Sequence, residues 1–515
     1  MKTCVVRKRI PPYSGSVPVN IADTIYTPPG FGTPKFAICF YTNGNDNDVF
    51  DESSTNRVYG IGYIGLSALD NSTLIALTSV LGLQHNESSS TATNKSVSGN
   101  YYGRFVSEIR VSDRSVFRQF TAPVFGQDKL DYNLSHVNTS SNNLDLIFAF
   151  FTGDDVQANI GTTNLSITRG AAVSVTGMAF APDLVFISGT GYSYNANGLD
   201  GRLSFGCSTK FGTIKNSCTA FRMRNTAAAV TTVSEYISDT RCFSMFALNS
   251  GIASTAEVTS FNNDGFTLTS REAFTFSTTT STSQILFMAI KGPLSNIFNL
   301  QNYSSSTSTG ISGIATTDYI PSLILGALGS AISTNTITTS NDSTGFSAFA
   351  VKALNSKSNY GLGSMSVSNG ASAVTGSGTA FSSLNPGDII YNSTNTQIGT
   401  VSSVSNNTSL TLTSGASAAM SSENYSIIPF GQFSVSIGAS NSAATTKVYS
   451  AINTNPFFVA SYGTSATPTT LVKAKVNNFD SYPGFKINYD TVNATARKGW
   501  FVAFKDNENR RRDAN

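Results

Sequence analysis

The chain has 515 residues and a formal net charge of +3, and 12% of its residues are charged, below the roughly 25% typical of soluble domains. Its length exceeds what one hydrophobic core supports and predicts three or four domains. The small net charge excludes the electrostatic footprint of a nucleic-acid-binding protein. The 20 Tyr and 35 Phe residues supply too much apolar surface for an intrinsically disordered chain.

The distribution of residue types predicts an all-β fold. Short runs rich in Phe, Tyr, Val and Ile alternate with stretches of Ser, Thr, Asn and Gly, as in β-sandwiches with long polar loops. Long amphipathic runs with helix caps are missing. No run reaches the roughly 20 apolar residues of a membrane span, and Pro11 and Pro12 interrupt the first apolar stretch before it resembles a signal peptide. We therefore expect a protein that is made in the cytosol and does not insert into a membrane.

Residues 1–30 are predicted to form an extended N-terminal arm, because its prolines disfavour helices and the centres of sheets. Basic residues cluster near both ends of the chain: Lys2, Arg7, Lys8 and Arg9 in the arm, and Arg510, Arg511 and Arg512 in a predicted C-terminal tail of residues 509–515. We expect these clusters to be solvated; the alternative is that they dock on an acidic neighbouring subunit.

One β module is predicted to occur three times. Its closing part, a turn, an alternating strand and a dense apolar strand, is clearest in residues 259–291 and 476–505 and looser in 124–153. Repeats of this size indicate whole domains and not a solenoid. In the strand 59–67, Gly at alternate positions leaves one face bare, which favours close approach of another layer. The predicted modules cover residues 31–157, residues 158–292, and residues 293–363 together with 429–508.

A different texture interrupts the third module. Residues 364–428 are mostly small, with the turn Asn385-Pro386-Gly387-Asp388 among short apolar runs. An insertion whose ends lie close together is best tolerated at an exposed loop tip. We therefore predict a small β-barrel or sandwich that is carried on such a tip.

Groups suited to catalysis are scarce. His85 and His136 are the two histidines, and each stands in a polar stretch without a matching partner, so a structural or solvated role is expected and not that of a general base. Nucleophile elbows, phosphate-binding loops and metal-binding helices are missing. The sequence thus predicts a protein that is not an enzyme, with no catalytic, cofactor-binding or metal-binding residues assigned.

Two acidic groups are the alternatives to that prediction. Asp154 and Asp155 follow an apolar strand, and a second group gathers after an earlier strand: Asp46, Asp48, Asp51 and Glu52. Paired carboxylates are what a glycosidase requires, and the second group also offers oxygens for Ca²⁺, although it lacks the spacing of an EF-hand loop. Ordinary turn chemistry is the expected role of both.

Exposed aromatic residues are candidates for sugar binding, namely Tyr101, Tyr102, Tyr192 and Tyr194. Trp500 stands at the head of an apolar strand and is expected to pack in a core. The five cysteines are sparse and odd in number, which argues against a disulfide framework. A bridge between Cys207 and Cys218 across a hairpin is the alternative, and cytosolic synthesis disfavours it.

The second module opens with a Pro-x-apolar strand, continues with a Gly-rich strand, and closes with Asn263-Asp264-Gly265-Phe266-Thr267-Leu268 and Phe287-Met288-Ala289-Ile290-Lys291-Gly292. In these features the chain resembles a repeated domain of virion proteins of tailed bacteriophages, best in residues 159–292, well in 430–507 and weakly in 31–153. Residues 366–381 resemble a small β module of phage fibre and appendage proteins. The resemblance implies tandem jelly-roll-like or lectin-like sandwiches used in assembly or adhesion.

On this basis we expect a non-enzymatic virion protein, made in the host cytoplasm, that serves as a tail or neck fibre or appendage for host attachment. The alternatives are a capsid decoration protein that stabilises the head and, third, a glycan-degrading tailspike, which predicts a long parallel β-helix. The expected partners are other virion proteins (adaptor, tail or capsid subunits), further copies of the chain in a homotrimer, and a host-surface glycan. A symmetric oligomer would let neighbouring subunits cover one another's sheet edges.

Overall fold

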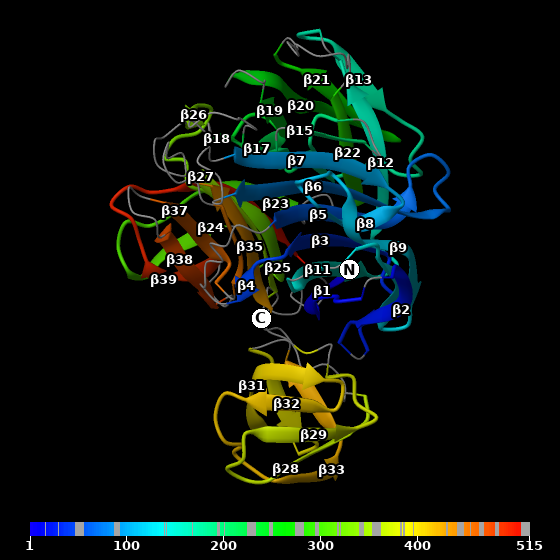
Figure 1. Cartoon of the computed structure of the whole chain (residues 1–515), viewed down its shortest axis with the longest axis vertical. Helices are drawn as coiled ribbons and strands as arrows, with labels where there is room; N and C mark the ends of the chain where they lie inside the picture. Colours follow the sequence, from blue (N-terminus) through cyan, green and yellow to red (C-terminus); the bar gives the residue numbers. More distant parts are fainter. Residues whose placement is uncertain are drawn as a thin grey trace.

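The protein is all-β, as its residue pattern predicted. A computed structural model describes the chain except for residues 16, 29, 47–55, 87–92, 139, 141, 167, 193–195, 200, 224–232, 247–250, 273–282, 294–297, 317–318, 320, 339–343, 353–361, 382–383, 385–386, 395, 429–430, 440–447, 454, 463–467, 479–483 and 506–515. The strands of the described residues form six sheets (Figure 1).

Three tandem jelly-roll-like sandwiches make up most of the molecule. The first contains β1 (Lys2–Ile10), β2 (Val19–Tyr26), β3 (Phe36–Thr42), β5 (Arg57–Ser67), β6 (Leu74–Asn86), β7 (Thr93–Tyr102), β8 (Arg104–Ile109), β9 (Val116–Gly126), β10 (Lys129–His136) and β11 (Leu144–Thr152). The second contains β12 (Gln157–Leu165), β13 (Ala172–Val175), β14 (Leu184–Gly189), β16 (Gly201–Thr209), β17 (Lys215–Met223), β18 (Val233–Ser238), β19 (Phe243–Phe246), β20 (Ile252–Asn262), β21 (Gly265–Ser270) and β22 (Ser283–Lys291). The third contains β23 (Phe298–Ser304), β24 (Gly310–Thr316), β25 (Leu323–Gly329), β27 (Thr344–Lys352), β35 (Gln432–Ala439), β36 (Val448–Asn453), β37 (Phe457–Tyr462), β38 (Pro468–Asn478), β39 (Gly484–Thr491) and β40 (Lys498–Phe504).

The three sandwiches share one topology. In each, the first, tenth, third, fourth, fifth and sixth strands, in that spatial order, form the larger sheet. The second, ninth, eighth and seventh strands form the smaller sheet. The closing parts recognised in the sequence are the hairpins β9–β10, β20–β21 and β38–β39 with the last strands β11, β22 and β40. Each last strand returns to lie between the first and third strands, paired on both sides and buried, which explains its dense apolar sequence.

The predicted extended arm of residues 1–30 is wrong. This segment supplies β1, which pairs with β11 from Lys2 opposite Thr152 to Ile10 opposite Leu144, and β2, which pairs with β10. Its apolar residues Cys4, Val5 and Val6 are buried, and burial of this run outweighs the prolines because Pro11 and Pro12 fall between the two strands, where no sheet hydrogen bond is lost.

The bare face of the Gly-rich strand is where the two sheets of the first sandwich meet closely. A Cβ at Gly62 would lie 1.9 Å from the backbone oxygen of Phe105 in the opposite sheet. Gly206 holds the corresponding position in the second sandwich, 2.2 Å from the Cys242 carbonyl oxygen. In the third sandwich Phe349 occupies this position. The glycine is instead Gly326, which pairs with Phe349 from the adjacent strand β25, and its missing side chain leaves space for the aromatic ring of Phe349.

A short strand from each sandwich joins it to the next. The loop between the third and fourth strands contributes β4 (Asn45–Asp46), β15 (Ala196–Leu199) and β26 (Ile337–Thr338). Each pairs with the sixth strand of another sandwich: β15 with β7, β26 with β18, and β4 with β36. The second sandwich thus binds the first, the third binds the second, and the first binds the third. The chain closes on itself as a ring of three sandwiches.

One hydrophobic core is shared by the whole ring. It collects residues from the larger sheets of all three sandwiches, while each sandwich also has a core of its own between its two sheets. At the shared core the ring of Phe205 lies 5.4 Å from that of Phe40 and 5.0 Å from that of Trp500, so one contact chain crosses all three sandwiches. The Trp500 Nε1 also donates a hydrogen bond to Thr219 Oγ1 at 3.2 Å. Each larger sheet is therefore buried on both faces.

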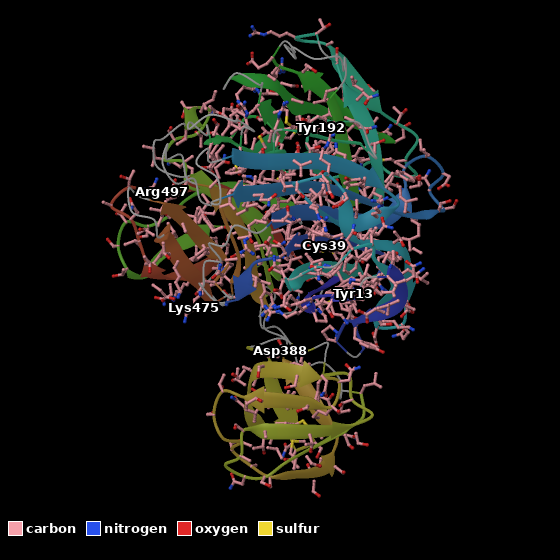
Figure 2. The ribbon with its side chains drawn as sticks, in the orientation of Figure 1. Tyr13, Cys39, Tyr192, Asp388, Lys475 and Arg497 are labelled. Atoms are coloured by element: carbon pink, nitrogen blue, oxygen red, sulfur yellow. The ribbon has the colours of Figure 1, made fainter. Side chains whose placement is uncertain are left out.

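Residues 364–428 form a separate small barrel, hereafter the inserted barrel. Its strands are β28 (Ser364–Val367), β29 (Ala373–Ser377), β30 (Ile389–Asn392), β31 (Gln397–Asn406), β32 (Ser409–Leu412), β33 (Met420–Glu423) and β34 (Tyr425–Ile428). The edge strands β33 and β34 are separated only by Asn424, which brings the two ends of the sheet together, and the barrel has its own core. Figure 1 shows it in yellow, standing off from the body, and Figure 2 places Asp388 at its near end. It leaves the body between β27 and β35, where Val351 pairs with Gln432.

Candidate functional site

The acidic candidates do not assemble into a site. Asp155 accepts a hydrogen bond from the N-terminal ammonium group at 2.5 Å, and the exposed Asp154 lies 3.8 Å from the Lys35 ammonium. Asp46 belongs to β4 by its backbone. Asp48, Asp51 and Glu52, like the side chain of Asp46, lie outside the described residues. Among the residues that are described, no group of three or more His, Cys, Asp or Glu side chains could hold a metal ion.

His136 packs inside the first sandwich. Its ring stacks on Tyr13 with 4.4 Å between centroids, and the residue is 5% exposed. Burial lowers the pKa of His136, and the nearby Arg118 charge lowers it further. These surroundings favour the neutral, structural histidine expected from the sequence. His85 belongs to β6, and its side chain lies outside the described residues.

The aromatic candidates are dispersed. Tyr101 is buried beneath Arg104, Tyr102 is 41% exposed, and Tyr192 lies half-buried with the Arg202 guanidinium 5.8 Å from its ring centroid. Tyr194 lies outside the described residues. Trp500 is fully buried, so its predicted packing role is confirmed. The structure therefore brings no aromatic platform for a sugar together from the described candidates.

The five cysteines are free thiols, and all are buried. Cys207 faces the shared core, whereas Cys218 Sγ lies 3.3 Å from Ser244 Oγ on the other side of the sheet. The two pair with Ser217 and Gly206 and not with each other. The alternative disulfide between them is wrong because adjacent positions of a strand point to opposite faces.

The N-terminal basic residues are ion-paired within the chain. Arg7 and Arg9 each place a guanidinium nitrogen 2.9 Å from the carboxylate of Asp145, which is fully buried, and Lys8 lies 3.1 Å from Asp23. The expectation of a solvated, unpaired cluster is wrong for these three residues, whereas docking on another subunit stays a prediction. Arg510, Arg511 and Arg512 lie outside the described residues.

The strongest candidate for a binding site is a groove between the second and third sandwiches. It has a volume of about 590 Å³ and is lined by residues 214–216 at the start of β17, Asp239 and Thr240, residues 257–259 of β20, and residues 300–302 of β23. Sequence analysis missed it because these four segments are far apart in the chain and none carries a recognisable motif.

Hydrogen bonds fix both walls of the groove. On the second sandwich, the Asn216 side chain bonds to the backbone of Val258 in both directions, at 2.9 and 3.3 Å. On the third sandwich, Asn302 Oδ1 accepts a hydrogen bond from Ser217 Oγ at 2.7 Å. The Lys215 ammonium donates to the Leu300 carbonyl oxygen across the groove at 3.4 Å. The long Lys215 contact is the weakest of these.

The charges around the groove are largely compensated. Glu257 forms ion pairs with Arg241, at 2.9 Å, and with Arg271. Asp239 accepts hydrogen bonds from Thr334, at 3.0 Å, and from Asn335. With Lys215 and Asp239 both in its lining, the groove has little net charge. It offers hydrogen-bond donors and acceptors together with a small apolar surface.

All named elements of the chain are strands. The described residues include no helix that is long and apolar enough to cross a membrane. Comparison of the chain with models of protein families, with curated proteins and with solved structures finds no match.

Proposed function

We propose that the protein is a non-enzymatic structural component of a bacteriophage particle, a tail or neck fibre or appendage protein that attaches to the virion and recognises the host surface. The observation that carries the proposal is the closed ring of three sandwiches around one core, from which the inserted barrel projects on a loop tip. Such a body is a rigid mount for a separately folded module. The proposed place of action is the assembled virion.

The surface chemistry supports the same class of function. With 12% charged residues and a net charge of +3, the chain has little long-range field. Contacts with proteins or glycans then depend on shape and hydrogen bonds. The proposed partners are the adaptor, tail or capsid subunits of the particle and a glycan of the host surface.

A capsid decoration protein is the second candidate. An extended N-terminal arm would serve as an anchor in a fibre and in a decoration protein alike, and residues 2–10 and 19–26 are instead strands of the first sandwich. The tailspike alternative required a long parallel β-helix, but among the described strand pairs only β5–β12 and β4–β36 are parallel. The described residues therefore give it no support.

The oligomeric state needs its own measurement. The argument for a symmetric oligomer is that subunits cover one another's sheet edges, but here β4, β15 and β26 cover edges within one chain. The number three comes only from the resemblance to phage fibres. A homotrimer stays a prediction. Size-exclusion chromatography with light scattering would give three times the chain mass of 54.4 kDa if it holds.

Gold-labelled antibodies on intact particles from the source, viewed by electron microscopy, test the proposal. Gold confined to the tail or neck is the expected result. Gold spread over the head would replace the appendage by the decoration protein. Particles without gold would overturn the assignment to a virion.

A further inference from the structure

We propose that the groove accepts an extended segment of a neighbouring polypeptide, which adds as a strand to the open edge of β23. This deepens the proposed function, on which it rests only for the identity of the neighbour as another virion protein. Strand addition takes its affinity from main-chain hydrogen bonds and its specificity from alternate side chains.

The edge of β23 is open on the side of the groove. Within the described residues, β23 pairs only with β40 and ends the order of its sheet. The Leu300 carbonyl oxygen points into the groove, because it accepts the Lys215 ammonium there. Backbone groups of a strand alternate in direction, so the N–H and C=O of Asn302 face the groove as well. Ser305 fits this alternation, since its N–H bonds to Arg497 on the other side.

The corresponding edge in the second sandwich is already occupied by a strand. Ile160 of β12 and Leu300 of β23 hold the same register relative to the closing and third strands. The Ile160 carbonyl oxygen accepts a hydrogen bond from the Ala68 backbone N–H at 2.9 Å, and Leu66 pairs in parallel with Asn159. Here the hairpin β5–β6 of the first sandwich supplies the missing strand.

The second sandwich does not do the same for the third. Phe211, in the turn between β16 and β17, packs against the core of the third sandwich. The Leu300 carbonyl oxygen meets a lysine ammonium at 3.4 Å in place of a backbone N–H. The groove therefore lies at an edge that stays open in the third sandwich and is paired at the equivalent position in the second.

The walls define the segment that fits. Ile214 is half-buried and gives the groove its apolar surface, whereas the side chains of Val258 and Leu300 are buried in hydrophobic cores; the remaining lining residues are polar. Because the charges of the groove nearly balance, an uncharged segment fits best. We infer an extended, uncharged stretch of mostly polar side chains, with one apolar side chain placed against Ile214.

A simpler role for Lys215 is to blunt an edge strand against aggregation, which lysines commonly do. The two roles differ in a measurable way, because a blunted edge binds no strand. The chain itself provides the probe: a fluorescein-labelled peptide of the uncharged residues 63–69, which contains the segment that fills the equivalent edge. It is titrated with the full-length protein and followed by fluorescence anisotropy.

Two matched pairs test the geometry. In the peptide, N-methylation at Ala68 removes the N–H equivalent to the one that bonds Ile160, and N-methylation at Leu69 removes one on the opposite side of the strand. In the protein, Asn302→Pro removes an outward N–H, and Asn302→Ala removes the same side-chain contact with Ser217 but keeps the N–H. We expect saturable binding that falls about tenfold on losing one such hydrogen bond, in the Ala68-methylated peptide and in Asn302→Pro, with the two controls near wild type.

The proposal is overturned if the peptide shows no saturable binding up to about 1 mM protein, because a Kd of that size corresponds to only about 4 kcal/mol of binding free energy. Equal binding in all variants would overturn it as well. If the groove binds the neutral oligosaccharide maltoheptaose and not the peptide, and if Asn302→Ala abolishes that binding, the groove is a glycan site and the proposal is overturned. Should Asn302→Pro fail to fold, the N-methylated peptides still decide on wild-type protein. The peptide assay needs no particle, so it is independent of the gold labelling.

Discussion

At the scale of single residues, Glu235 makes the junction between the second and third sandwiches chemically different from the other two junctions. Its cross-strand neighbour is Phe221, and the corresponding positions of the other sandwiches hold Ser98 and Ser450. Glu235 is fully buried, and its Oε2 accepts hydrogen bonds from the backbone N–H of Ser330, at 3.1 Å, and from its hydroxyl. Its Oε1 has no hydrogen-bond partner among the described residues. Burial raises the pKa of Glu235 to about 8, although the bonds to Ser330 and the Arg497 charge oppose the shift.

Glu235 should make the stability of the protein depend on pH. The folded chain keeps this proton up to a pKa of about 8, whereas the unfolded chain releases it near the ordinary pKa of 4.5. The folded state therefore binds more protons over this range, and the free energy of unfolding falls as pH rises, by at most about 1.4 kcal/mol per pH unit. We expect Glu235→Gln to remove this fall in urea denaturation between pH 5 and pH 8.

The matched control for Glu235 is Asp70→Asn. Hydrogen bonds from Thr73 and Ser72 lower the pKa of this exposed carboxyl to about 2, so its charge is constant above pH 5. The control should keep the wild-type slope. Equal slopes in wild type and Glu235→Gln would show that the buried carboxyl does not titrate in this range.

Trp500 is the one tryptophan of the chain and links the third sandwich to the second. We expect Trp500→Ala to lower the free energy of unfolding by about 3–5 kcal/mol, the usual cost of truncating a large buried aromatic residue. Trp500→Phe keeps most of the ring contact and should cost clearly less. Guanidinium denaturation followed by circular dichroism measures both. A loss below 1 kcal/mol in Trp500→Ala, within the range of a surface change, would show that the shared core does not depend on this ring.

At the scale of elements, the fourth strand of each sandwich sets the distance between two sheets. Gly62 and Gly206 admit a backbone oxygen of the opposite sheet, and in the third sandwich Gly326 makes room for Phe349. The close approach predicted from alternating glycines is therefore confirmed for Gly62. In the same alternation Gly60 lies beside the Tyr41 ring, whereas Gly65 falls on the opposite face, beside Ile160 of the shared core. The pattern therefore predicted the bare face but not what fills each gap.

Gly206→Ala tests this spacing. The new methyl group would lie 2.2 Å from the Cys242 carbonyl oxygen, and a backbone atom cannot turn away as a side chain can. We expect a loss of about 1–3 kcal/mol in the free energy of unfolding from overpacking. Gly251→Ala is the control, because no atom lies within 4 Å of its Cβ. Similar stabilities of the two variants in thermal denaturation would contradict the close approach.

At the scale of the whole molecule, the ring and the inserted barrel are separate folding units. The sandwiches share one core, so a single sandwich exposes the apolar face of its larger sheet. The inserted barrel has a core that it shares with no sandwich. Cooperative unfolding of the ring, with independent unfolding of the barrel, follows from this division.

Removing residues 353–430 should leave a folded ring. The Lys352 N–H already bonds to the Gly431 carbonyl oxygen at 2.9 Å, so an Asn-Gly turn can join the ends. We expect the shortened chain to stay soluble, and residues 362–428 to fold alone, by circular dichroism and size-exclusion chromatography. Residues 157–292 alone should instead aggregate, and a soluble monomer of that fragment would contradict the shared core.

The sequence by itself determined the all-β class, the threefold repeat and the place of the insertion, because these depend on local alternation, turn residues and spacing along the chain. It also predicted the buried Trp500 from its neighbours in one strand. It did not reveal the role of residues 1–30, since the partner of β1 is β11, more than 130 residues later, and Arg7 and Arg9 form ion pairs with Asp145 of that distant strand.

The tertiary structure alone decided the ring, the buried Glu235 and the groove. Each depends on which sheet edges meet. Edges pair through main-chain hydrogen bonds, which nearly every residue type can form, so the amino-acid sequence does not identify the partner of an edge. The edges of β12 and β23 illustrate this, because one is paired by the hairpin β5–β6 and the other is left open at the groove. Their register is the same, but at β23 the turn of the neighbouring sandwich packs Phe211 against the core of the third sandwich and adds no strand.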